Sequence, residues 1–212
     1  MRKLIDGIQR FQQDVIPTEK QLFEELANGQ HPVALVITCS DSRIDPNLVT
    51  QTKPGEIFVL RTAGNIVPPY DALHSGEAAT IEYAVKVLQV PDIIICGHSH
   101  CGAVGGLLAP SSIKTLPAVQ AVLKFADKTA QVMREEFGDV TEPEERLAVG
   151  VQQNVLNQIE NLRTHPAVAE AVAAKTLEIH GWVYTFETGV VTTYDPASKR
   201  FVDVAEGAKP AF

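Results

Sequence analysis

Short, predominantly apolar runs recur along the chain, and each run ends at a cluster of polar residues. Such runs are typical of strands that are buried on both faces of a sheet. They are expected to form strands at 33–38, 57–60, 92–97 and 177–186. Helical patterns between them, such as 75–88, indicate βαβ units, and 190–194 is expected to pair back as a hairpin. We therefore predict an α/β fold with a central, mainly parallel β-sheet, about four parallel strands plus an antiparallel edge strand, flanked by helices.

The N-terminal segment 1–28 has a helical pattern, interrupted at Pro17, and precedes the first strand. It has no strand to cross over to, so it packs either on its own core or on another subunit. We predict that 1–212 is a single domain in which 1–28 is a helical arm and 203–212 is a loose tail. Further helices are expected at 45–50, 102–108, 111–137 with a kink near Pro117, 141–162 and 166–174.

Composition and charge exclude several classes of protein. The chain has 212 residues, 45% of them hydrophobic and 21% charged, which is typical of a globular protein. The net charge of −8 argues against nucleic acid as a partner. No apolar run is long enough for a bilayer span or a secretory signal. Three cysteines without an export signal indicate a reducing compartment, so we expect a cytoplasmic location without membrane association.

Metal-ligating side chains follow the first and third predicted strands. Cys39 ends the first, and His98 and Cys101 follow the third. The carboxyl ends of parallel strands meet at one edge of a sheet, so we expect these side chains to lie together. Two thiolates and one imidazole form a zinc site that leaves a fourth position for water, whose pKa zinc lowers to about 7. One Zn2+ per chain is predicted. A Cys39–Cys101 disulfide is the alternative, but the spacing of His98 from Cys101 favours a metal.

Two charged residues accompany these ligands. Asp41 follows Cys39 by two positions and can approach the metal or its water, while Arg43 can hold Asp41 through a bidentate pair. Asp41 could instead occupy the fourth position and close the site, or cap the following turn with Arg43 as a surface charge. Four other candidates lack a partner pattern, and structural roles are favoured for them: Cys96, His100, His74 and His180.

Together, Cys39-x-Asp41-Ser42-Arg43 and His98-x-x-Cys101-Gly102 resemble the motifs of the β-class carbonic anhydrases. The resemblance extends over nearly the whole chain, from Gln30 to Tyr184. It implies that Cys39, His98 and Cys101 bind zinc. It also implies that Asp41 and Arg43 form a catalytic dyad, which gates the zinc site and orients the reacting group there. The activity it implies is the reversible hydration of CO2 to bicarbonate and a proton.

The plant-like subgroup of this family adds a substrate pocket. Four residues match its positions, and Ala63 stands where the subgroup has valine. The resemblance thus implies substrate binding by Gln30, Phe58, Ala63, Tyr83 and Gly102, with Gln30 hydrogen-bonded to CO2 or bicarbonate. It also implies a homodimer or a higher even-numbered homo-oligomer, in which Gln30 and Tyr83 reach the zinc of a neighbouring subunit.

A second, regulatory bicarbonate site occurs in another subgroup, which has a tryptophan three residues before the first cysteine. Val36 occupies that position here, although Arg61 and Tyr184 match the rest of that site. We therefore predict that bicarbonate inhibits this protein only weakly. From the residues alone, Arg61 could orient loops, hold an anion or form a plain salt bridge.

The stretches 45–48 and 97–101 are similar to those of cyanobacterial carboxysomal relatives. This implies a carboxysome location and carboxysome proteins as partners if the source is a cyanobacterium. Two alternative functions remain. One is a carbon disulfide or carbonyl sulfide hydrolase on the same scaffold. The other is a non-enzymatic assembly protein with a structural zinc, against which Asp41 and Arg43 argue because a structural site needs neither.

Overall fold

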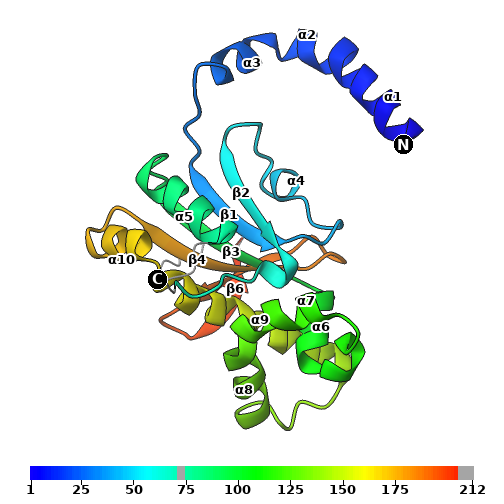
Figure 1. Cartoon of the computed structure of the whole chain (residues 1–212), viewed down its shortest axis with the longest axis vertical. Helices are drawn as coiled ribbons and strands as arrows, with labels where there is room; N and C mark the ends of the chain where they lie inside the picture. The colour runs from blue at the N-terminus through cyan, green and yellow to red at the C-terminus, as the bar shows by residue number, and fades with distance from the viewer. Residues whose placement is uncertain (71–74, 205–212) are drawn as a thin grey trace. The chain divides into compact units, whose positions relative to one another are not determined.

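The computed structural model describes residues 1–70 and 75–204, which fall into two compact units, Met1–His31 and Pro32–Phe212. The first unit is helical, as predicted for the arm, and none of the residues in its helices is buried. Its elements are α1 (Arg2–Arg10), a π-helical segment (Phe11–Val15), α2 (Ile16–Thr18) and α3 (Lys20–Leu26) (Figure 1). The single-domain assignment of 1–212 stays a prediction.

The second unit is built on a six-stranded sheet with the order β2-β1-β3-β4-β5-β6. The four strands β1 to β4 are parallel, and β5 and β6 are antiparallel, which confirms the predicted fold class (Figure 1). The strands are β1 (Ala34–Cys39), β2 (Ile57–Thr62), β3 (Asp92–His98), β4 (Glu178–Tyr184), β5 (Val191–Asp195) and β6 (Arg200–Asp203).

Strand β6 was not expected. Its turn is closed by Asp195, whose carboxylate accepts hydrogen bonds from the backbone of Ala197 and from the backbone and hydroxyl of Ser198. Four residues are too few for an alternating pattern to be recognised in the sequence. The predicted tail, 203–212, therefore begins inside β6, and 205–212 lies outside the described residues.

The central strands are buried on both faces, as their apolar runs predicted. Every residue of β1 is buried, and so is every residue of β3 after Asp92. Leu35 pairs with Ile93 and Ile37 with Ile95 in the β1–β3 register, and all four side chains are fully inaccessible. This core holds the carboxyl ends of β1 and β3 side by side.

Helices connect and cover the strands. The stretch 111–137 is largely helical and breaks just before Pro117, as predicted, but it is divided further, by 3₁₀ turns at Pro110–Ile113 and Lys124–Ala126. The second break lies where the carbonyl of Phe125 accepts a hydrogen bond from Asn161 (2.8 Å), a tertiary contact. The helices of this unit are α4 (Pro46–Thr50), α5 (Gly76–Lys86), α6 (Gly102–Leu108), α7 (Pro117–Leu123), α8 (Asp127–Glu135), α9 (Pro143–Arg163) and α10 (Pro166–Ala173).

The long helix α9 packs against β3, β4, α6 and α8. It approaches β3 closely at Gly97, where a Cβ atom would lie 2.9 Å from side-chain carbons of both Val151 and Val155. A larger residue at Gly97 would therefore push α9 away from the strand that ends at His98. Within the described residues, no helix is both long and apolar enough to cross a membrane.

Candidate metal centre

Three potential ligands converge at the carboxyl ends of neighbouring strands. Cys39 is the last residue of β1, His98 is the last residue of β3, and Cys101 is the N-cap of α6. Their ligand atoms lie within 4.8 Å of one another, and all three residues are buried. The cysteines are free thiols, so the disulfide alternative is not realised.

The donor set fits zinc. Nδ1–H of His98 donates a hydrogen bond to the carbonyl of Ser99 (2.8 Å), so in the neutral ring the lone pair lies on Nε2. That Nε2 atom is buried and has no hydrogen-bond partner among the described residues. An unpaired buried nitrogen is costly, and a metal ion would satisfy it. The ring also stacks on Phe186, with centroids 4.9 Å apart, which fixes its plane.

A hydrogen bond between the two thiols shifts their pKa values in opposite directions. A hydrogen bond from Cys101 lowers the pKa of Cys39, and the backbone N–H of Gly64 also donates to the Cys39 sulfur at 3.3 Å. The same bond to the Cys39 thiolate, followed by burial, raises the pKa of Cys101 well above its usual range. A divalent cation between the sulfurs favours the thiolate form of both residues.

Arg43 holds Asp41 in the predicted bidentate pair. Nε donates to Oδ1 at 2.9 Å, and an NH2 group donates to Oδ2 at 2.7 Å. The side-chain hydrogen bond from Arg43 keeps the pKa of Asp41 well below its usual range, so Asp41 is a carboxylate. Oδ1 also accepts from the backbone N–H of Arg43 (2.9 Å), which is the turn contact considered as an alternative. Arg43 further contacts the carbonyl of His100 (3.1 Å).

Arg61, at the end of β2, orients the loop that follows Cys39. Its guanidinium donates hydrogen bonds to three backbone carbonyls, those of Cys39 (3.0 Å), Asp41 (2.6 Å) and Ile44 (2.9 Å). Of the roles that the sequence left open for Arg61, loop orientation is the one that these contacts support.

The residues assigned to substrate binding are less tightly grouped. Phe58 and Tyr83 have ring centroids 6.1 Å apart, and Tyr83 is 46% exposed, which is unlike a core aromatic. Gly102 begins α6 beside Cys101, and Ala63 belongs to the short 3₁₀ turn Ala63–Asn65. Gln30 lies in the N-terminal unit. The substrate-binding assignment of these five residues stays a prediction.

Sequence reasoning missed a set of buried amides on α9 that reach the loop after β2. Asn154 and Gln158 are essentially inaccessible, and their side chains hydrogen-bond to backbone groups of Gly64 and Val67. The only available signal was their spacing of four residues within the apolar stripe of a long helix.

The residues for which structural roles were favoured lie elsewhere or serve other contacts. His180 hydrogen-bonds Asp92 (2.7 Å), and with Glu178 these form a second group of potential ligands at the opposite ends of β3 and β4. His100 pairs with Glu187, beside the dyad. Burial raises the pKa of Cys96 to about 12, so it is an inert thiol. His74 lies outside the described residues.

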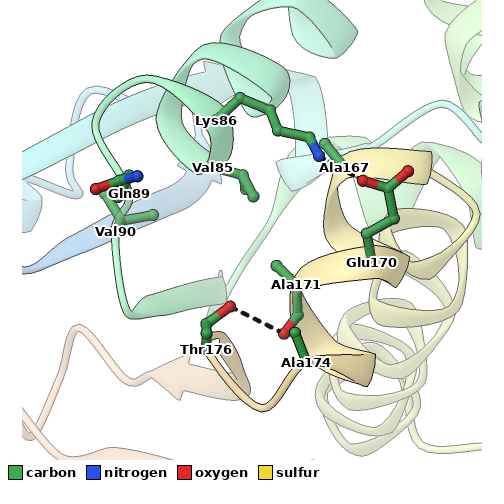
Figure 2. A pocket seen from close by; sticks show the side chains of 9 residues that line it. All are labelled: Val85, Lys86, Gln89, Val90, Ala167, Glu170, Ala171, Ala174 and Thr176. Atoms are coloured by element: carbon green, nitrogen blue, oxygen red, sulfur yellow. Dashed lines mark hydrogen bonds and ion pairs between the residues drawn. The ribbon is translucent and has the colours of Figure 1, made fainter.

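A surface groove of about 500 Å3 lies between the C-terminal part of α5 and helix α10 (Figure 2). Lys86 and Glu170 form an ion pair there, and Thr176 donates to the carbonyl of Ala171 at 3.2 Å. None of the predicted catalytic, substrate-binding or metal-binding residues lines this groove, so it is not the candidate active site.

A mainly parallel sheet with a buried thiol–imidazole–thiol group at its carboxyl edge is typical of a metal-dependent α/β enzyme. A family model described as carbonic anhydrase matches residues 34–191. A carbonic anhydrase of Pseudomonas aeruginosa is 49% identical over 206 residues, which cover 97% of this chain and 93% of the relative.

Solved structures that superpose on this chain support the same family. The β-carbonic anhydrase CcaA superposes with a TM-score of 0.93 at 44% identity, covering 96% of this chain and 91% of that one. A β-carbonic anhydrase of Sordaria macrospora, described as tetrameric, gives a TM-score of 0.80 at 31% identity, covering 91% and 95%. The chain belongs to the β-class carbonic anhydrase family.

Proposed function

We propose that this protein catalyses the reversible hydration of CO2 to bicarbonate and a proton, with one Zn2+ held by Cys39, His98 and Cys101. The observation that carries this proposal is the buried, unpartnered Nε2 of His98, within 4.8 Å of two thiol sulfurs. Zinc bound there supplies Lewis acidity and lowers the pKa of a coordinated water to about 7.

The side chains around the metal supply orientation. Asp41 is ionised because Arg43 binds both of its oxygens, so it can accept a hydrogen bond from the attacking water and direct a lone pair at the CO2 carbon. Arg61 fixes the backbone of Asp41 and thereby the direction of its side chain. Product protons pass to buffer.

The substrate pocket is proposed to include Phe58, Ala63, Tyr83 and Gly102, which offer apolar surface to CO2. The Gln30 amide is proposed to donate a hydrogen bond to a CO2 oxygen. We infer a homodimer or a higher even-numbered oligomer, which the tetrameric relative supports. A cytoplasmic location is proposed, with the carboxysome and its proteins as the setting if the source is a cyanobacterium; a cyanobacterial carbonic anhydrase of Synechocystis is 44% identical.

A stopped-flow assay of CO2 hydration, with metal analysis of the same sample, tests this proposal. We expect one zinc per chain and rapid acidification, and we expect Cys39→Ala to lose both. Zinc without activity would favour the structural-zinc alternative. Sulfide release from carbonyl sulfide or carbon disulfide, with negligible CO2 hydration, would favour the hydrolase alternative. Gln30→Ala is expected to retain zinc and to slow turnover. An unchanged rate would show that Gln30 is only part of the connector into the first strand.

A further inference from the structure

Two buried amide side chains of α9 hold the loop that follows β2. Nδ2 of Asn154 donates to the carbonyl of Gly64 at 2.9 Å, and the backbone N–H of Val67 donates to Oε1 of Gln158 at 2.9 Å. Nε2 of Gln158 in turn donates to Oδ1 of Asn154 at 3.0 Å. Because the two residues are four positions apart, they lie on one face of the helix and form a connected ladder.

This ladder ends at a proposed metal ligand. Gly64 uses its carbonyl to accept from Asn154 and its N–H to donate to the Cys39 sulfur at 3.3 Å. Gly64 has a φ of +68°, and a Cβ atom there would lie 2.8 Å from Cβ of Ala103. Gly64 is therefore confined by backbone conformation, by its neighbour in α6 and by α9 at the same time.

An N–H group aimed at a thiolate withdraws charge from the sulfur and so changes the metal–sulfur bond. The direction of the Gly64 N–H depends on the orientation of the peptides on both sides of this residue. Asn154 anchors one of them, and Gln158 anchors both Asn154 and the end of the loop at Val67. Helix α9 also sets the position of β3 through its contact at Gly97, next to His98.

We propose that Asn154 and Gln158 are positioning residues of the metal centre, which act through Gly64 on the thiolate of Cys39. The inference rests on the proposed function, because it assumes that Cys39 binds the metal. It adds that the metal–sulfur bond is tuned from a helix that supplies no ligand.

The chain offers a matched control on the same helix. Asn157 is also a buried amide of α9, but its Oδ1 accepts from the backbone N–H (3.3 Å) and hydroxyl (3.0 Å) of Thr129 in α8. Its Nδ2 donates to Oδ1 of Asn161 at 3.4 Å, so its link to the ladder runs through Asn161. Asn154→Ala and Asn157→Ala therefore both remove a buried amide, and Asn154→Ala alone breaks the contact to Gly64. A general loss of stability would affect both variants.

The experiment uses the full-length protein loaded with Co2+ in place of zinc, and with zinc in parallel. The thiolate-to-cobalt absorption band and the rate of metal loss to a chelator are measured. We expect Asn154→Ala to shift the band and to lose metal about 10-fold faster. Asn157→Ala is expected to keep the wild-type band and to lose metal within about twofold of the wild-type rate. If Asn154→Ala does not fold, Gln158→Met is measured in its place. It keeps the side-chain volume and removes the hydrogen bonds to the Val67 N–H and to Asn154, while the bond from Asn161 to the Val67 carbonyl remains.

Two failures are distinguishable. If wild-type protein takes up no more metal than Cys39→Ala, the proposed metal site itself is wrong. If wild-type protein binds cobalt with a thiolate band, but Asn154→Ala and Asn157→Ala behave alike, the ladder only stabilises the fold and the positioning role is overturned.

Discussion

Arg43 binds both carboxylate oxygens of Asp41, at 2.9 Å to Oδ1 and 2.7 Å to Oδ2. The guanidinium also lies 4.8 Å above the ring centroid of Phe186, the residue on which His98 stacks. The pair is thus held against the aromatic group that orients a proposed ligand. An ionised, oriented carboxylate beside the metal group is suited to directing a water molecule rather than to storing a proton.

The first prediction concerns this pair. Asp41→Ala is expected to retain one zinc per chain, because Asp41 is not among the three proposed ligands. It is expected to lose about 100-fold or more in kcat/KM, because the attacking water is no longer oriented. Stopped-flow CO2 hydration and metal analysis measure the two quantities. Arg43→Lys is expected to give a smaller loss, since lysine keeps the charge but cannot form the two-pronged contact. Loss of zinc from Asp41→Ala would contradict the assignment.

The second prediction concerns protons released on zinc loading. Near neutral pH the pKa shifts leave Cys39 ionised and Cys101 protonated in the metal-free protein. Zinc requires both thiolates, so at about pH 6, where a zinc-bound water of pKa about 7 stays protonated, loading should release about one proton from the thiol pair rather than two. Calorimetric titration of zinc in buffers of different ionisation enthalpy measures this number. Because a proton competes with the metal, zinc affinity should fall as pH falls; release of two protons would show that the thiols do not share one.

Arg61 is the basis of the third prediction. Arg61→Met removes the donors to the carbonyls of Cys39, Asp41 and Ile44 while keeping a long side chain. We expect retained zinc, a decrease of about 1 kcal/mol in the free energy of unfolding, and about 10-fold lower kcat/KM because the Asp41 loop loses its anchor. Urea denaturation and stopped-flow kinetics measure these effects. Arg134→Met, at the end of α8, is the matched control and should change neither the free energy of unfolding nor kcat/KM. Equal effects of the two variants would show that Arg61 does not position the Asp41 loop.

The convergence of Cys39, His98 and Cys101 was predictable because the geometry of parallel sheets is general. Strand ends on β1 and β3 meet at one edge whatever the side chains, and the Asp41–Arg43 pair spans only two residues. The amides of α9 were not predictable, since Asn154 contacts a carbonyl 90 residues away. The break near Phe125 was missed for the same reason, because its carbonyl is bound by Asn161. Local patterns thus predicted which residues meet at the candidate metal centre, whereas the contacts that hold those residues in place are tertiary.

The last prediction is that bicarbonate inhibits weakly and without cooperativity. The subgroup with a regulatory bicarbonate site is expected to have a tryptophan where this chain has Val36, a buried residue of β1. Arg61, which matches another part of that site, already donates to three backbone carbonyls, so binding an anion would compete with its hold on the Asp41 loop. Initial rates of CO2 hydration at increasing bicarbonate, with ionic strength held constant by sulfate, should follow simple product inhibition with a Hill coefficient of about 1. A steep, sigmoidal loss of activity would mean that bicarbonate draws Arg61 away from these carbonyls, and Arg61→Met should then abolish the sigmoidal response.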